Sequence, residues 1–159
     1  MIKIRTAEDP ESLAAARELV RAHIENLPTP HDPIATERII AALPAPYLEP
    51  AGALWVAWAG EAALGCAALH GLTPDTAELK RMYVRPEARG RGVARRLTEH
   101  VIAKAAERGY ARLRLGTLTS AHAAQRLYTS LGFRKIAPYR SVEFGDTWFY
   151  ELPLTALAG

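Results

Sequence analysis

Residues 89–95 form a basic segment with two glycines, and this combination of residue types could bind phosphate. The segment reads RGRGVAR. Gly90 and Gly92 keep the turn free of side chains and allow backbone angles that other residues resist, and the small Ala94 lets a following helix pack closely. The start of that helix would offer unpartnered N–H groups and a partial positive charge to an anion. The segment therefore predicts a phosphate-binding turn.

The positive charge of the chain is concentrated around this turn. Residues 80–96 hold seven basic residues and one acidic residue, a local charge of +6, whereas the whole chain carries +3 and the remainder −3. This concentration indicates a local polyanion site. Nucleic-acid binding is the main non-enzymatic alternative, but the segment lacks interleaved aromatic residues and the acidic remainder would repel the strand. We therefore expect no nucleic-acid partner.

Other common site patterns are absent from the sequence. The dinucleotide motif G-x-G-x-x-G fails because Arg95 occupies its third glycine position, and G-x-x-x-x-G-K-[ST] does not occur. Cys66 is the single cysteine, which excludes an internal disulfide, and we expect it to be a buried strand residue rather than an acyl-carrying nucleophile. The histidines show no metal-ligand spacing, so no metal site is expected.

Length and composition indicate one globular domain. The chain has 159 residues, of which 49% are hydrophobic and 23% charged, so we expect a single domain over residues 1–159. No apolar run approaches the roughly 20 residues that span a bilayer. The N-terminal stretch MIKIRTAEDPES also lacks the apolar core of a signal peptide. We therefore expect a cytoplasmic protein with no membrane partner.

The elements that must position the turn follow from hydrophobic periodicity. Strands are expected at residues 2–6, 53–59, 62–71, 77–84, 112–118, 133–144 and 147–154. Helices are expected after the cap Asp9, over residues 34–43, from Val93 to near Gly109, and over residues 124–131 before Gly132. The turn thus lies between a strand and an amphipathic helix.

Three segments resemble the Gcn5-related N-acetyltransferase family. Residues 89–94, RGRGVA, match every fixed position of its pyrophosphate loop, which reads Arg or Gln, two residues, Gly, one residue, then Gly or Ala. Residues 78–86, ELKRMYVRP, look like its central strand and proline turn, and residues 124–133, AQRLYTSLGF, look like its later helix. The resemblance implies the acyl-CoA N-acyltransferase fold, an α/β fold. Its mixed, mostly antiparallel twisted sheet has about six or seven strands, splayed at the centre and flanked by about four helices.

The resemblance also implies acetyl-CoA as the cofactor. In this family the splayed strand leaves backbone groups unpaired, and the pantetheine arm pairs with them. The N–H of Met82 would also polarise the thioester carbonyl. Many members carry Asn where this chain has Ala121, so either His122 or Ser120 would take over that contact or the contact would be weaker. The expected cofactor-binding residues are Met82, Tyr83, Val84, Arg89, Gly90, Arg91, Gly92, Val93, Ala94, Arg95 and His122.

Two catalytic residues are implied by position. Glu78, at the start of the splayed strand, matches a frequent general base, which would take the proton of the amine through a water; His70 and Glu143 are the alternatives. Tyr128 occupies the position of a general acid that protonates the departing thiolate. Its alternative interpretation is a core aromatic residue.

The acceptor is expected to bind between the first two helices and the loop between the last strands. Aromatic walls with one arginine suit a small primary amine that bears a carboxylate, such as an amino acid. Peptide or protein amines and a non-catalytic acyl-CoA sensor remain alternatives. The sequence leaves the oligomeric state open, and a homodimer is one candidate because family members often dimerise. The expected pocket residues are Tyr47, Tyr139, Arg140, Asp146 and Trp148.

Overall fold

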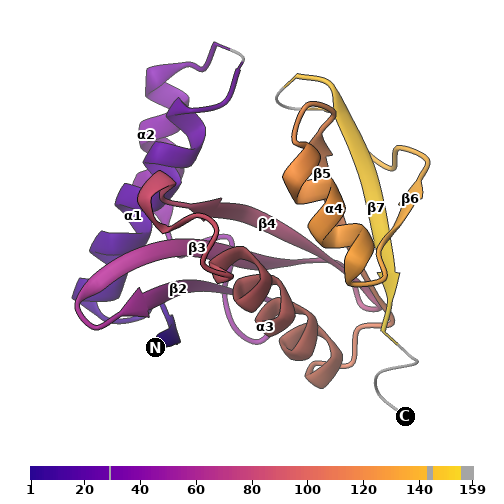
Figure 1. Ribbon diagram of the computed structural model, residues 1–159, viewed down its shortest axis with the longest axis horizontal. Coiled ribbons are helices and arrows are strands. Elements are labelled where there is room, and N and C mark those ends of the chain that lie inside the picture. Colours follow the sequence, from indigo (N-terminus) through magenta and orange to yellow (C-terminus); the bar gives the residue numbers. More distant parts are fainter. Residues whose placement is uncertain (29, 143–144, 155–159) are drawn as a thin grey trace.

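A computed structural model describes residues 1–28, 30–142 and 145–154. Seven strands form one sheet in the order β1-β2-β3-β4-β5-β7-β6, and every neighbouring pair is antiparallel except β4 and β5 (Figure 1). The expected mixed α/β sheet is confirmed. The strands are β1 (Ile2–Thr6), β2 (Ala53–Ala59), β3 (Ala62–Thr73), β4 (Thr76–Val84), β5 (Arg112–Leu118), β6 (Arg134–Ile136) and β7 (Thr147–Pro153).

Four α-helices cover the two faces of the sheet. One core cluster joins the sheet to α1 and α2, and the other joins it to α3 and α4. The cap of α1 forms as expected, because the N–H of Ser12 donates to Asp9 Oδ1 at 2.9 Å and Pro10 begins the helix. None of the helices in the described ranges has the length and apolarity needed to cross a bilayer. The helices are α1 (Pro10–Glu25), α2 (Pro33–Ala42), α3 (Val93–Glu107) and α4 (His122–Ser130).

The sheet opens between β4 and β5. These strands pair only where Thr76–Glu78 meets Arg112–Arg114, and from Leu79 to Val84 no register with β5 exists. Because pairing stops halfway along β4, the two strands separate toward their carboxyl ends. The expected splayed strands are therefore present.

A bulge in β4 lies beside this opening. The β3–β4 register shifts between Cys66 and Ala68, and Arg81 has a φ of 55°, a left-handed conformation that is uncommon outside glycine. The buried Cys66 thiol lies 3.2 Å from the carbonyl oxygen of Arg81. Burial raises the pKa of this thiol to about 12, so it stays neutral and unreactive.

The expected strand at residues 133–144 is too long. Among the described residues of this range, 133–142, only Arg134–Ile136 pairs with β7. Pro138 cannot donate a backbone hydrogen bond, and the next two side chains, Tyr139 and Arg140, turn toward Glu78 of β4. The chain after β6 therefore forms a loop that returns over the sheet instead of extending it.

Candidate active site

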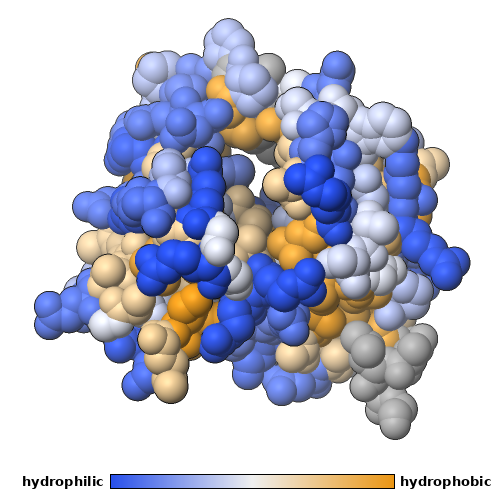
Figure 2. Space-filling view, viewed as in Figure 1, coloured by the Kyte–Doolittle hydropathy of each residue, from blue (hydrophilic) through white to orange (hydrophobic). Residues whose placement is uncertain are grey.

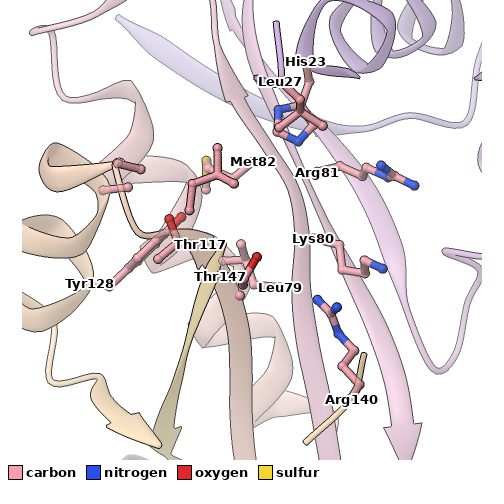
Figure 3. Close-up of a pocket in the computed structure, with 14 residues that line it drawn as sticks. His23, Leu27, Leu79, Lys80, Arg81, Met82, Thr117, Tyr128, Arg140 and Thr147 are labelled. Carbon is pink, nitrogen blue, oxygen red and sulfur yellow. The ribbon is translucent and has the colours of Figure 1, made fainter. Parts of the chain in front are cut away.

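A cavity of about 260 Å³ occupies the opening between β4 and β5. Figure 2 shows the molecule hollowed between its two halves, and Figure 3 shows side chains from both halves around the cavity. Helix α1 contributes to one side and α4 to the other. The lining residues are His23, Leu27, Leu79, Lys80, Arg81, Met82, Gly116, Thr117, Leu118, Ala121, Ala124, Tyr128, Arg140 and Thr147.

Three basic side chains line the cavity. Lys80, Arg81 and Arg140 line it, and no Asp or Glu is found among its described lining residues. The side chain of Arg81 is fixed by its Nε, which donates to the Tyr47 hydroxyl at 3.0 Å. Such a cavity favours an anionic group on whatever molecule enters it.

His23 lies in this cavity as a neutral imidazole. Burial, with a smaller contribution from the nearby Arg81 charge, lowers its pKa to about 4, and its ring lies 6.0 Å from that of Tyr83. Sequence reasoning gave His23 no role, because nothing in a helical histidine indicates that α1 will end beside a cavity. A neutral imidazole can both donate and accept a hydrogen bond there.

Tyr128 reaches into the cavity from α4. Its side chain is only 4% exposed, and Figure 3 shows it directed toward Met82 and Thr117. Burial raises the pKa of this phenol well above its usual value, so it carries its proton throughout the physiological range. The expected general acid is thus placed opposite the β4 strand, although its catalytic role stays a prediction.

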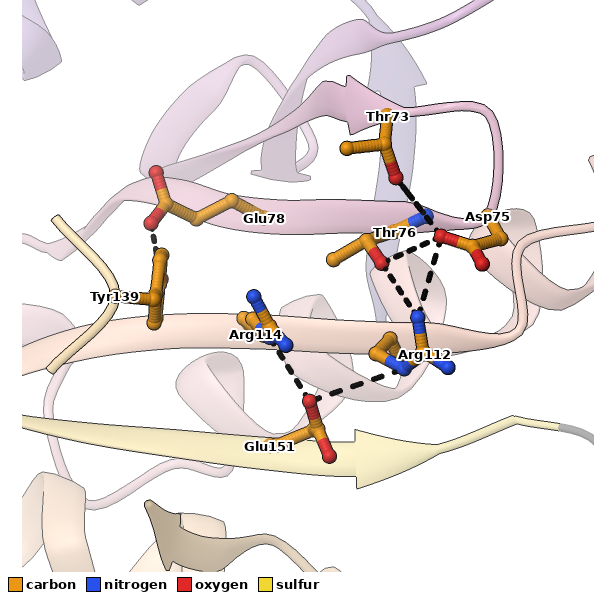
Figure 4. A network of polar contacts seen from close by, with 8 residues as sticks. All are labelled: Thr73, Asp75, Thr76, Glu78, Arg112, Arg114, Tyr139 and Glu151. Atoms are coloured by element: carbon orange, nitrogen blue, oxygen red, sulfur yellow. Dashed lines mark hydrogen bonds and ion pairs between the residues drawn. The ribbon is translucent and has the colours of Figure 1, made fainter. Parts of the chain in front are cut away.

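Glu78 precedes the cavity-lining stretch of β4, and its carboxylate is covered by the loop after β6. The side chain is 1% exposed, and Oε2 accepts hydrogen bonds from Tyr139 Oη and from Arg140 Nε, the latter at 2.9 Å. Lys80 Nζ lies 3.8 Å from Oε1. Figure 4 shows Tyr139 meeting Glu78, with Arg114 and further ion pairs along the same side of β5. The expected base is therefore shielded in this arrangement.

The alternative bases differ in how far the structure describes them. His70 is the register partner of Glu78 on β3 and packs its ring against Tyr47 at 5.8 Å. Burial, followed by the charge of Lys80, lowers its pKa. His70 does not line the cavity, and Glu143 lies outside the described residues.

The predicted phosphate-binding turn is exposed and its amides are open. Gly90 and Gly92 have φ values of 77° and 80°, and Gly92 is the N-cap of α3. Among residues 1–28, 30–142 and 145–154, no acceptor takes the N–H groups of residues 90–95. Two of the surrounding arginines are anchored: Arg89 Nε donates to the Val84 carbonyl at 3.1 Å, and Arg95 reaches Ser130 Oγ at 2.8 Å. The turn can thus receive an anion while its shape is held.

The remaining expected site residues are distributed more widely. Met82 lines the cavity, whereas Tyr83 and Val84 are buried on either side of β4 and do not line it. His122 is exposed at the start of α4 and does not line the cavity. Asp146 and Trp148 line a separate surface hollow with Thr119 and Val142, which corrects their expected place in the acceptor pocket. No group of three or more possible metal ligands occurs within the described ranges.

We expect His23 to make stability depend on pH. Unfolded His23 takes up a proton near pH 6.5 but folded His23 only near pH 4, so the unfolded state binds more protons between these values. The free energy of unfolding should therefore fall as the pH drops through this window, with roughly 1–3 kcal/mol due to His23. Urea denaturation at stepped pH measures it.

His23→Gln is the informative variant for this test. In this variant the free energy of unfolding should fall less steeply as the pH drops. Some fall should remain, because the pKa values of His70 and His100 are also lowered in the folded protein. Equal slopes for wild type and variant would show that His23 titrates normally in the folded protein.

Comparisons with known proteins agree with this architecture. The model of the acetyltransferase (GNAT) family matches residues 14–133. YsnE, an uncharacterized N-acetyltransferase of Bacillus subtilis, is 36% identical over 94 residues, covering 58% of this chain and 61% of that protein. N-acetylaspartate synthetase of Danio rerio is 37% identical over 116 residues, covering 72% of this chain and 38% of that protein. This chain thus spans less than two thirds of the length of either relative.

A solved structure shares the fold over almost the whole chain. The acetyltransferase yncA of Salmonella typhimurium, solved with acetyl-CoA, superposes with a TM-score of 0.79 at 25% identity. The match covers 97% of this chain and 94% of that one.

Proposed function

The chain belongs to the acetyltransferase (GNAT) family, and we propose that it transfers the acetyl group of acetyl-CoA to the primary amine of a small carboxylate-bearing acceptor, an amino acid. The observation that carries this proposal is the cavity between the splayed strands, where Lys80, Arg81 and Arg140 gather with no acidic lining residue in the described chain. The name of the N-acetylaspartate synthetase relative supports an acidic amino acid as acceptor.

The open amides of residues 90–95 fit the diphosphate of acetyl-CoA. They face solvent at the positive end of α3, and Arg91 adds an exposed positive charge beside them. Near this turn, residues 82–84 have no register partner on β5, and this edge of β4 suits the extended pantetheine arm. When bound, acetyl-CoA supplies the acetyl group as an activated thioester.

Residues around the cavity supply the oxyanion contact, the proton donor and the proton acceptor. The N–H of Met82 stabilises negative charge on the carbonyl oxygen, and Tyr128 donates a hydrogen bond to the departing sulfur. Because burial raises its pKa, Tyr128 acts as a donor that stays protonated. Glu78 takes the proton of the incoming ammonium group through a water, since only the neutral amine has the lone pair that attacks.

An acceptor screen tests the proposal. Free thiol release is measured with acetyl-CoA and one of four classes: amino acids, polyamines, aminoglycosides or peptides. We expect amino acids, and acidic ones above all, to give the highest kcat/KM, because polycations would be repelled by the cavity. Preference for a polyamine or aminoglycoside would overturn the carboxylate assignment. Binding of acetyl-CoA without thiol release from any acceptor would indicate a sensor.

A further inference from the structure

We propose that Arg140 couples recognition of the acceptor to the availability of Glu78, by moving its guanidinium from Glu78 to the carboxylate of the bound acceptor. This inference rests on the proposed function and adds a specificity-determining residue to it. An acceptor without a carboxylate would leave Arg140 on Glu78 and the proton acceptor blocked.

The carboxylate of Glu78 is occupied on one of its two oxygens. Its Oε2 accepts two hydrogen bonds, from Tyr139 and Arg140, and its side chain is 1% exposed. Both lone pairs of Oε2 are engaged in this way, and the other oxygen, Oε1, faces the Lys80 ammonium at 3.8 Å, whose positive charge disfavours a proton there. Glu78 can therefore receive a proton at Oε2 only after one of its two donors has left.

Of the two hydrogen-bond donors to Glu78, Arg140 is the one that can leave. Arg140 lines the cavity and its side chain is 29% exposed, whereas Tyr139 does not line the cavity. The Tyr139 ring is also held by the Arg114 guanidinium at 4.8 Å and by the Phe149 ring at 4.9 Å. Arg140 is thus the donor that an incoming acceptor would meet.

The groups beneath Arg140 would let its guanidinium shift position without a clash. Its Cζ lies 5.2 Å from the Phe149 ring centre and 5.8 Å from that of Tyr139, and Gly116 lies beneath its terminal nitrogen. A Cβ at Gly116 would come within 3.2 Å of Arg140 Nη2, so glycine leaves this space open. Contacts with flat rings persist through a small displacement, and a planar guanidinium pairs with a carboxylate through two parallel hydrogen bonds.

The consequence is a proton path that opens only with the right acceptor. Once Arg140 pairs with the acceptor carboxylate, a water can approach Glu78 Oε2. One N–H bond of the acceptor ammonium then breaks, and its proton passes through that water to form an O–H bond on Glu78. The amine keeps the electron pair with which it attacks the acetyl carbon. Carboxylate recognition should therefore appear in kcat as well as in KM.

The test pairs acceptors that differ only in charge. Thiol release is measured with L-aspartate and its diamide, and with L-alanine and L-alaninamide, for wild type, Arg140→Gln and Arg140→Lys. Wild type should turn over each amide with a kcat about 10-fold or more below its acid, the equivalent of one lost charged hydrogen bond. In Arg140→Gln, the KM of the acids should rise at least about 10-fold while the kcat of the amides increases.

Controls separate this coupling from other roles. Arg140→Lys keeps the charge and should restore part of the discrimination. Arg112→Gln removes a guanidinium that pairs with Asp75 and Glu151 without lining the cavity, and should leave the ratio of acid to amide unchanged. Thermal unfolding and acetyl-CoA affinity are measured for every variant.

Two results would overturn the inference. If Arg140→Gln raises the KM of the acids but leaves the kcat of the amides unchanged or lower, Arg140 binds the acceptor without controlling Glu78. If wild type releases no thiol with any of the four acceptors although it binds acetyl-CoA, the proposed function fails, and the inference fails with it.

Discussion

Gly92→Val should weaken acetyl-CoA binding about 100-fold, roughly 2.7 kcal/mol, while the protein remains folded. Gly92 has a φ of 80°, and a Cβ there would meet no heavy atom within 4 Å. The cost to folding is therefore only the left-handed backbone, about 1–2 kcal/mol. The cost to binding is larger, because a branched side chain at the N-cap of α3 stands among the open amides of residues 90–95. Isothermal titration with acetyl-CoA measures the change.

Gly60→Val is a matched control for this substitution. Gly60 has a φ of 59°, and a Cβ there also meets nothing within 4 Å, but it lies in the turn between β2 and β3. Both variants should lose similar stability in thermal unfolding, and only Gly92→Val should lose affinity. Equal acetyl-CoA affinities in the two variants would mean that the diphosphate binds elsewhere.

Tyr128→Phe should lower kcat about 100-fold and change the affinity for acetyl-CoA little. Removing the hydroxyl deletes a proton donor from the cavity, and positioned proton donors contribute roughly 10²–10⁴-fold. The packing should survive, because the ring stays against Phe133 at 5.7 Å. Because burial raises the pKa of the Tyr128 phenol, Tyr128 stays protonated over the neutral to alkaline pH range in the wild type. The pH profiles of kcat for wild type and Tyr128→Phe should therefore have the same shape on the alkaline side. Steady-state kinetics over the neutral to alkaline range measures both effects.

Tyr150→Phe controls for loss of a buried hydroxyl. Tyr150 belongs to the same core cluster as Tyr128 but does not line the cavity, so its variant should keep nearly full turnover. A Tyr128→Phe enzyme as fast as Tyr150→Phe would make Tyr128 a core aromatic residue, the alternative that the sequence left open.

Local features of the fold were predictable because they depend on neighbours in the chain. Asp9 and Pro10 begin α1 where the sequence places them, since a cap acts within one helical turn. The glycines at 90 and 92 take the left-handed angles that their residue type allows. The predicted strand at 133–144 was wrong because sheet pairing needs a distant partner, and β7 pairs with only three of the described residues in this range.

The sequence by itself determined a strand, a glycine turn and a helix, and with them a place where a phosphate can bind. Only the tertiary structure decided what surrounds the acceptor. Glu78 meets Tyr139 and Arg140 across 61 and 62 positions of the chain, and His23 of α1 lies near Arg81 of β4 on one side of the opening of the sheet. Neither contact can be predicted from the local sequence, because hydrophobic periodicity and capping depend on residues only a few positions apart. Contacts between distant side chains depend on where the sheet splays and on how the loop after β6 returns over it.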